Sequence, residues 1–208
     1  MKVIIGGMGL SGSTLCYNIF RVLRDNSHLD YEVIKIHEYN SILATLGKTI
    51  FMVRDLRDTV ASMLRKDPER WAGNVEEASK YQMMWYYDTW EGINKDIVWK
   101  YEEYKSNPYQ YTYSTISKLG LNVSYDLVKQ VIDTCENIKD MNIPHNQDFI
   151  QTEEEAILWE TTKMSKKHIT NGGKIGGYKD YLTEEQIRFI ETKYKYFFAK
   201  ENYKLDYN

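Results

Sequence analysis

Residues 1–14 constrain the fold of this chain more than any other segment. The apolar run Val3–Ile5 leads into the glycine-rich stretch Gly6–Gly12, and residues 13–24 then carry apolar side chains at helical spacing. Glycines let backbone N–H groups approach an anion with no Cβ in the way, and the start of a helix adds unpaired N–H groups and a positive dipole end. The order of strand, loop and helix predicts a phosphate-binding loop. The plainer alternative is a tight strand-to-helix turn.

The loop departs from the Walker A motif at one position. The spacing from Gly7 to Gly12 matches that motif, but Ser13 stands where the motif requires a lysine. An ordinary kinase or ATPase would therefore lack its contact to the β- and γ-phosphates. Residues 49–53, followed by Asp55, resemble a Walker B strand only faintly, so a P-loop kinase remains an alternative.

Strands and helices are expected to alternate along the whole chain. The patterns predict strands at 3–5, 32–37, 49–53 and 96–101, and helices at 13–24, 58–65, 74–94, 108–119, 125–135, 153–167 and 183–200. A capping box is expected at the start of the last helix, with Thr183 as N-cap and Gln186 three residues on. The alternation predicts an α/β fold: one P-loop NTPase-like domain over residues 1–208, a three-layer sandwich with a central parallel β-sheet flanked by helices.

Composition excludes several classes of protein. The chain has 208 residues, of which 42% are hydrophobic, and this suits one domain with a real core. Its 27 basic and 30 acidic residues give a net charge of −3, so we expect no nucleic-acid partner and only a local basic patch for any phosphate. No apolar run approaches the roughly 18 residues of a membrane span. Cys16 and Cys135 fit neither a disulfide framework nor a metal site, which favours a cytoplasmic protein.

A lysine and a histidine close the second predicted strand. Ligands of open parallel sheets bind beyond the carboxyl ends of the strands, which would place Lys35 and His37 beside the glycine-rich loop. The two side chains share one face of the strand because they are two residues apart. Together they could stabilise a leaving anion and accept a proton. A solvated histidine at a strand end is the simpler interpretation.

Alternating basic and acidic residues follow the third predicted strand. Arg54 offers a planar guanidinium suited to phosphate, and Ser62, further along the predicted helix, could contact the same group. The competing interpretation is a surface network in which Arg54 and Arg57 pair with Asp55 and Asp58.

Taken in chain order, these motifs resemble the sulfotransferases that use 3′-phosphoadenosine 5′-phosphosulfate (PAPS). Two later segments agree: Val-Trp-Lys-Tyr-Glu-Glu-Tyr-Lys-Ser-Asn-Pro at 98–108, and Gly-Lys-Ile-Gly-Gly-Tyr-Lys-Asp-Tyr-Leu-Thr at 173–183. The resemblance covers residues 3–195 and implies in-line transfer of a sulfuryl group from PAPS to an acceptor hydroxyl or amine. The product would be adenosine 3′,5′-bisphosphate (PAP), and no metal would be required.

The resemblance also implies residue roles. His37 would be the general base, and Lys35 would contact the transferring sulfuryl group. The 5′-phosphosulfate would be held by the loop residues Gly9, Leu10, Ser11, Gly12, Ser13 and Thr14. Arg54 and Ser62 would bind the 3′-phosphate, Tyr101 would lie near the adenine, and Gly173 and Lys174 would belong to a loop that closes over the 3′-phosphate.

Three positions depart from the family pattern. Leu10 stands where the family usually has a basic residue, Leu15 replaces an aromatic residue, and Asn171-Gly172 replace an Arg-Lys pair. An active enzyme, a slow enzyme, a catalytically weak PAP- or PAPS-binding module and a purely structural α/β protein all stay open. We expect a small-molecule or carbohydrate acceptor and no membrane partner. The sequence indicates neither the acceptor's identity nor the oligomeric state.

Overall fold

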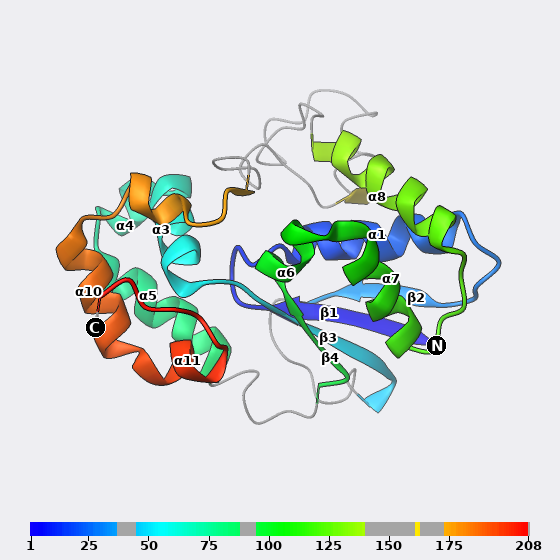
Figure 1. Cartoon of the computed structure of the whole chain (residues 1–208), viewed down its shortest axis with the longest axis horizontal. Coiled ribbons are helices and arrows are strands. Elements are labelled where there is room, and N and C mark those ends of the chain that lie inside the picture. Colours follow the sequence, from blue (N-terminus) through cyan, green and yellow to red (C-terminus); the bar gives the residue numbers. More distant parts are fainter. Residues whose placement is uncertain (37–44, 88–94, 140–160, 163–172, 208) are drawn as a thin grey trace.

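Four parallel strands form the centre of the computed structural model, which describes residues 1–36, 45–87, 95–139, 161–162 and 173–207 (Figure 1). The strands lie in the order β2-β1-β3-β4, and each neighbouring pair is parallel. Their bounds are β1 (Lys2–Gly7), β2 (Glu32–Lys35), β3 (Gly47–Val53) and β4 (Ile97–Lys100). Ile5 of β1 faces Lys35 on one side and Ile50 on the other. The predicted α/β fold with a central parallel sheet is confirmed.

One face of the sheet packs against helices from the first and middle parts of the chain. These are α1 (Ser13–Asp25), α6 (Tyr101–Ser106), α7 (Pro108–Lys118) and α8 (Tyr125–Lys139). Ile5, Ile50 and Met52 are buried in one cluster with residues of these helices. Trp99 of β4 joins the same cluster, and its ring meets that of Phe20 edge-on at 6.4 Å.

A second group of helices packs against the other face, around the carboxyl end of β3 and to the left in Figure 1. It comprises α3 (Leu56–Lys66), α4 (Pro68–Trp71), α5 (Val75–Met84), the short 3₁₀ helix η5 (Gly177–Asp180), α10 (Glu184–Lys193) and α11 (Lys195–Lys200). Phe51 and Val53 alternate with Met52 along β3, so they point to this face and join its core. Helices therefore flank the sheet on both faces, as predicted.

Several predicted boundaries are wrong. The last strand ends at Lys100, whose N–H donates to the hydroxyl of Tyr111 at 2.9 Å, and Tyr101 begins α6 instead. The predicted helix 183–200 is divided at Tyr194, although its capping box is confirmed by hydrogen bonds between Thr183 and Gln186 in both directions. α5 ends at Met84 and a π-helical turn follows at 85–87. The rest of the predicted helix 74–94 lies mostly outside the described residues, as does helix 153–167 apart from two helical residues, 161–162.

The charged residues after β3 are buried, which corrects the alternative of a surface network. Arg57 is paired with Asp55 at 2.6 Å and with Glu191 of α10, and it donates to the carbonyl of Lys204 at 2.9 Å. Glu191, 1% exposed, also accepts hydrogen bonds from the backbone N–H groups of Asp206 and Tyr207. The sequence pattern missed this burial because the segment that covers Arg57 is the C-terminal end of the chain.

No helix within the described ranges has both the length and the apolar character that crossing a membrane requires.

Replacing Glu191 with alanine tests this buried network. Glu191→Ala removes one carboxylate from a buried arginine and leaves two backbone N–H groups without an acceptor, so we expect the free energy of unfolding to fall by about 3–5 kcal/mol. The matched control on the same helix is Glu184→Ala, because Glu184 pairs with Arg188 at 2.7 Å in solvent and such pairs contribute less than about 1 kcal/mol. Urea denaturation measures both variants. Equal losses would show that the network does not stabilise the fold.

Candidate nucleotide site

The loop between β1 and α1 is fixed against β3. Gly7 has φ +149°, and a Cβ there would lie 2.3 Å from the carbonyl oxygen of Met52, so only glycine fits. The N–H of Met8 donates to that same carbonyl at 3.2 Å. The hydroxyl of Ser11 donates back to the carbonyl of Met8 at 2.6 Å. These bonds hold the loop in a tight curve at the carboxyl end of β1.

The backbone N–H groups of this loop are available to a ligand. Among the residues that the structure describes, no hydrogen bond uses the N–H groups from Gly9 to Leu15; the first bonded one is Cys16, which donates to Gly12 at 3.0 Å. Gly12 is the N-cap of α1, has φ +94° and provides no side-chain cap. A curved run of unpaired donors at the positive end of a helix dipole has the properties of an anion site. This geometry favours a phosphate cradle over a plain turn.

Arg54 joins this loop to the C-terminal part of the chain. Its guanidinium donates to the carbonyl of Leu10 at 3.3 Å and to the carbonyl of Lys174 at 3.1 Å. It lies 4.5 Å from the ring centroid of Tyr101 and 3.8 Å from the carboxylate of Asp58. Its Nε is buried and has no hydrogen-bond partner among the described residues. These contacts direct the guanidinium of Arg54 at the loop, while the buried carboxylate of Asp58 offsets part of its charge.

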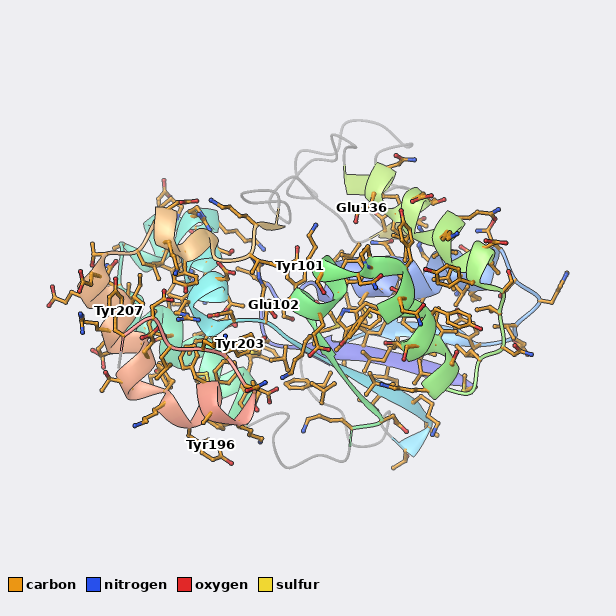
Figure 2. All side chains as sticks on the ribbon, viewed as in Figure 1. Tyr101, Glu102, Glu136, Tyr196, Tyr203 and Tyr207 are labelled. Carbon is orange, nitrogen blue, oxygen red and sulfur yellow. The ribbon has the colours of Figure 1, made fainter. Side chains whose placement is uncertain are left out.

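Tyr101 fills the space between the loop and the Gly173 segment (Figure 2). Its hydroxyl donates to the carbonyl of Gly173 at 3.1 Å, and a Cβ on Gly12 would lie 2.8 Å from its ring. Gly173 has φ +67°, and a Cβ there would meet the Tyr101 hydroxyl at 2.1 Å. Burial raises the pKa of Tyr101, despite the nearby charge of Arg54, so the phenol stays a neutral donor. Residues 12, 54, 101, 173 and 174 therefore converge.

Other predicted site residues have mixed outcomes. Lys35 lies at the end of β2 and donates to the hydroxyl of Thr14 at 2.6 Å, so the second motif does reach the loop. Ser62 is buried in α3, and within the described residues no hydrogen bond connects its hydroxyl to Arg54 or the loop. His37 lies outside the described residues.

Asp58 fixes the C-terminal segment to α3. Its carboxylate accepts hydrogen bonds from the backbone N–H groups of Gly176, at 2.8 Å, and Tyr178, at 3.0 Å. Burial raises the pKa of Asp58, while the nearby Arg54 acts in the opposite direction. The two acceptor bonds keep the start of η5 against α3, and hence the Gly173 segment beside Arg54. The sequence offered no sign of this role because the donors are backbone groups far along the chain.

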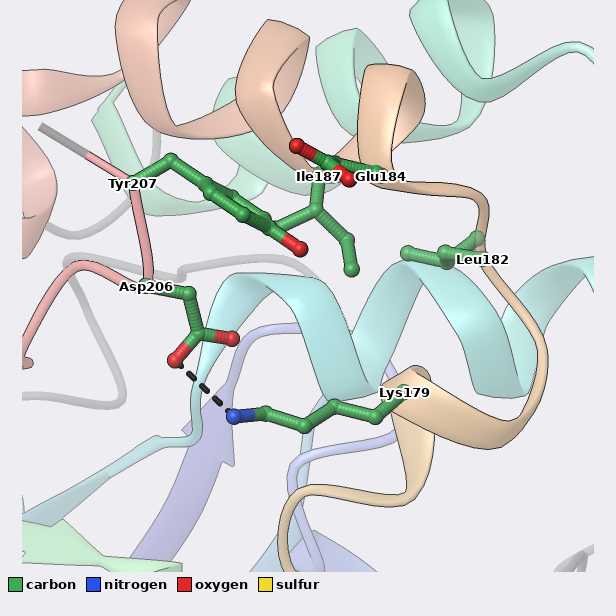
Figure 3. A pocket seen from close by; sticks show the side chains of 6 residues that line it. All are labelled: Lys179, Leu182, Glu184, Ile187, Asp206 and Tyr207. Atoms are coloured by element: carbon green, nitrogen blue, oxygen red, sulfur yellow. Dashed lines mark hydrogen bonds and ion pairs between the residues drawn. The ribbon is translucent and has the colours of Figure 1, made fainter.

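The lysines near this segment are paired with carboxylates. Lys174 pairs with Asp180 at 2.5 Å, and Lys179 pairs with Asp206 at 3.0 Å. The second pair borders a shallow pocket of about 380 Å³, lined by Lys179, Leu182, Glu184, Ile187, Asp206 and Tyr207 (Figure 3). These residues belong to η5, the turn that follows it, α10 and the C-terminal segment rather than to the loop, so the pocket is separate from the candidate site.

A parallel sheet with a phosphate-type loop and helices on both faces defines a P-loop-like α/β protein. Neither the protein-family models nor the curated protein sequences contain a match to this chain. Solved structures do match. The mouse sulfotransferase SULT7A1 complexed with PAP has a TM-score of 0.69 and 13% identity, over 97% of this chain and 85% of that one.

Two retinol dehydratase structures match as well. One, in complex with androsterone and inactive cofactor PAP, has a TM-score of 0.64 at 12% identity. The other, with retinol and PAP, has a TM-score of 0.61 at 13% identity. Each match covers 100% of this chain and 82% of the other. At such low identity the likeness concerns the fold, and this chain has the sulfotransferase fold.

The Asp58 contacts predict a local effect of substitution. In Asp58→Asn one side-chain oxygen becomes an NH₂ group, which leaves one backbone N–H without an acceptor and should destabilise the fold by about 1–3 kcal/mol. Hydrogen exchange at the amides of Gly176 and Tyr178 should accelerate beyond the global change. Asp180→Asn is the control, because its carboxylate pairs only with an exposed lysine. Unchanged exchange at both amides would contradict the role of Asp58.

Proposed function

We propose that this chain is a PAPS-dependent sulfotransferase that transfers a sulfuryl group to an acceptor hydroxyl or amine. The observation that carries the proposal is the convergence of Arg54, Tyr101 and the Gly173 segment beside a run of unpaired loop amides. It occurs in a chain with the sulfotransferase fold, whose structural neighbours were crystallised with PAP.

The residues present fit an adenosine 3′,5′-bisphosphate group. The amides from Gly9 to Leu15 would hold the 5′-phosphosulfate together with the hydroxyls of Ser13 and Thr14. Arg54, whose buried Nε has no partner among the described residues, would bind the 3′-phosphate together with Ser62, Gly173 and Lys174. Glycine at 12 and 173 keeps clear the space around Tyr101 that a Cβ would fill. Tyr101 would lie near the adenine.

The chain's own groups would provide the chemistry of transfer. PAPS supplies the activated sulfuryl group when it is bound. His37 would accept the proton of the acceptor oxygen, a role that contributes about 10²–10⁴-fold in rate. The N–H of Ile36 donates to the carbonyl of Ile5 at 2.9 Å, which holds the chain just before His37 at the carboxyl end of β1. Lys35 and the loop amides would stabilise developing negative charge, which makes a metal ion unnecessary.

The acceptor is proposed as a small molecule or carbohydrate. Two of the structural neighbours hold androsterone and retinol, respectively, alongside PAP. The formal net charge of −3 disfavours a polyanionic acceptor. We further propose one domain over residues 1–208 and a cytoplasmic location.

Calorimetric titration with PAP tests the donor site. We expect micromolar binding of PAP that does not need Mg²⁺, and weaker binding of ATP with Mg²⁺, because Ser13 cannot replace the Walker lysine. A preference for ATP with Mg²⁺ would favour the P-loop kinase. Absence of binding by both would leave the loop as a structural turn.

The same titration of Arg54→Ala assigns the 3′-phosphate. Arg54 also contacts two carbonyls, so the variant is compared on two ligands that differ only in the phosphate of interest: PAPS and adenosine 5′-phosphosulfate. PAPS should weaken far more than adenosine 5′-phosphosulfate. Equal losses would remove Arg54 from the 3′-phosphate site and leave it a structural link.

His37→Ala separates catalysis from binding. The variant should lose at least about 100-fold in turnover, because the acceptor proton has no base, while its affinity for PAP stays unchanged. The control is His28→Ala, at an exposed position after α1. Acceptor-dependent release of PAP from PAPS measures turnover. Activity of His37→Ala close to that of the control would rule out the assignment of the general base.

A further inference from the structure

Gln82 of α5 is a buried polar side chain that the folded protein leaves unsatisfied. It is 0% exposed, and within the part of the chain that the structure describes neither its buried Nε2 nor its buried Oε1 has a hydrogen-bond partner. Buried polar groups are nearly always hydrogen-bonded, and a carboxamide with both ends unpaired costs stability. Such a group is explained when a ligand supplies the missing partner.

The Gln82 carboxamide lies against the start of the loop. A Cβ built on Gly9 would be 3.2 Å from both Nε2 and Oε1 of Gln82, so the carboxamide touches the loop at its first unpaired amide. One turn further along, at the end of α5, the indole Nε1 of Trp85 is also buried without a partner. Of these two buried donors, the Gln82 amide is the one that lies against the loop.

The contacts at the two ends of the loop indicate which way a bound phosphosulfate would run along it. Tyr101 of α6 covers the Gly12 end together with the Gly173 segment, and Arg54 lies over the Tyr101 ring; these are the groups proposed to hold the nucleoside side. Arg54 also donates to the carbonyl of Leu10. Gln82 of α5 covers the Gly9 end. A phosphosulfate that leaves the nucleoside side and follows the loop amides runs toward Gly9. Its outer group, the sulfuryl, would then be the one that meets Gln82.

The loop itself lacks a basic side chain at this end. Residue 10 is leucine, and its carbonyl is turned toward Arg54. The ammonium of Lys35 donates to the hydroxyl of Thr14, beyond Gly12, where it would stabilise the charge that develops on the leaving phosphate. A neutral NH₂ group beside Gly9 can donate to an anionic oxygen, and bonds to charged acceptors are stronger than neutral ones.

We propose that Gln82 binds the sulfuryl group of PAPS through a hydrogen bond donated from its side-chain Nε2, an inference that rests on the proposed function. The contact is specific to the donor, because PAP has no sulfuryl group. Gln82 therefore distinguishes the loaded donor from the spent product.

The test compares the affinities of PAPS and PAP, measured by calorimetry without an acceptor. In Gln82→Met, which keeps the side-chain volume and removes the amide, PAPS should bind roughly 10-fold or more weakly while PAP binds as in the wild type. Loss of an unpaired buried amide should leave the melting temperature of the free protein unchanged or higher. Gln82→Leu is a second variant with the same expectation.

Thr112→Val is the matched control, because Thr112 of α7 is also buried with an unpaired hydroxyl, and it should change neither affinity.

Three outcomes would overturn the inference. Unchanged PAPS affinity in folded Gln82→Met and Gln82→Leu would show that the amide does not contact the sulfuryl group. Equal weakening of PAPS and PAP would mean that Gln82 supports the loop itself. Failure of the wild type to bind either nucleotide would reject the proposed function first, and the inference with it.

Discussion

The buried charges at the junction of β3 and α3 hold the two ends of this chain together. Arg57 is enclosed by Asp55, Glu191 and the carbonyl of Lys204, and an arginine buried without such partners would be strongly destabilising. The next residue, Asp58, accepts hydrogen bonds from the N–H groups of Gly176 and Tyr178. Apart from Asp55, these partners lie more than a hundred positions later in the chain. Satisfying these charges therefore brings the C-terminal segment to the first third of the sequence, and the candidate site depends on that approach.

The sheet order explains why the site forms where it does. β1 lies between β2 and β3, so the chain passes from β1 to β2 on one side and then to β3 on the other side. Such a reversal in the strand order leaves a crevice at the carboxyl end of β1. The loop after β1 leaves its amides unpaired in that crevice. Arg54 follows the neighbouring strand β3, Lys35 ends the other neighbour, β2, and Tyr101 follows β4. Four strand ends thus direct four different groups to one place, which is how a parallel sheet assembles a binding site from separated segments.

The electrostatics of the site rely more on amides than on cations. Lys174 and Lys179 are neutralised by Asp180 and Asp206, and residue 10 carries no charge. Arg54 and Lys35 are the basic side chains that contact the loop within the described residues. Amide donors act only at short range and in fixed directions, so recognition at this site requires an anion whose oxygens match the curve of the loop. The unpaired carboxamide of Gln82 extends that donor set by one side chain.

Local sequence determined the strand, loop and helix at the N-terminus, the capping box at Thr183 and the alternation that makes a parallel α/β sheet, because each depends on neighbours a few residues apart. The resemblance to the sulfotransferases, rather than local sequence, predicted that Arg54, Tyr101 and Gly173 would serve one site. Local sequence could not show that Tyr101 begins a helix, that Asp58 is buried beneath the C-terminal segment or that Gln82 lies unpaired against Gly9. The residues next to Tyr101, Asp58 and Gln82 in the sequence do not determine these three features. Tertiary structure decided them, because burial and hydrogen-bond satisfaction are set by distant segments packed against each side chain.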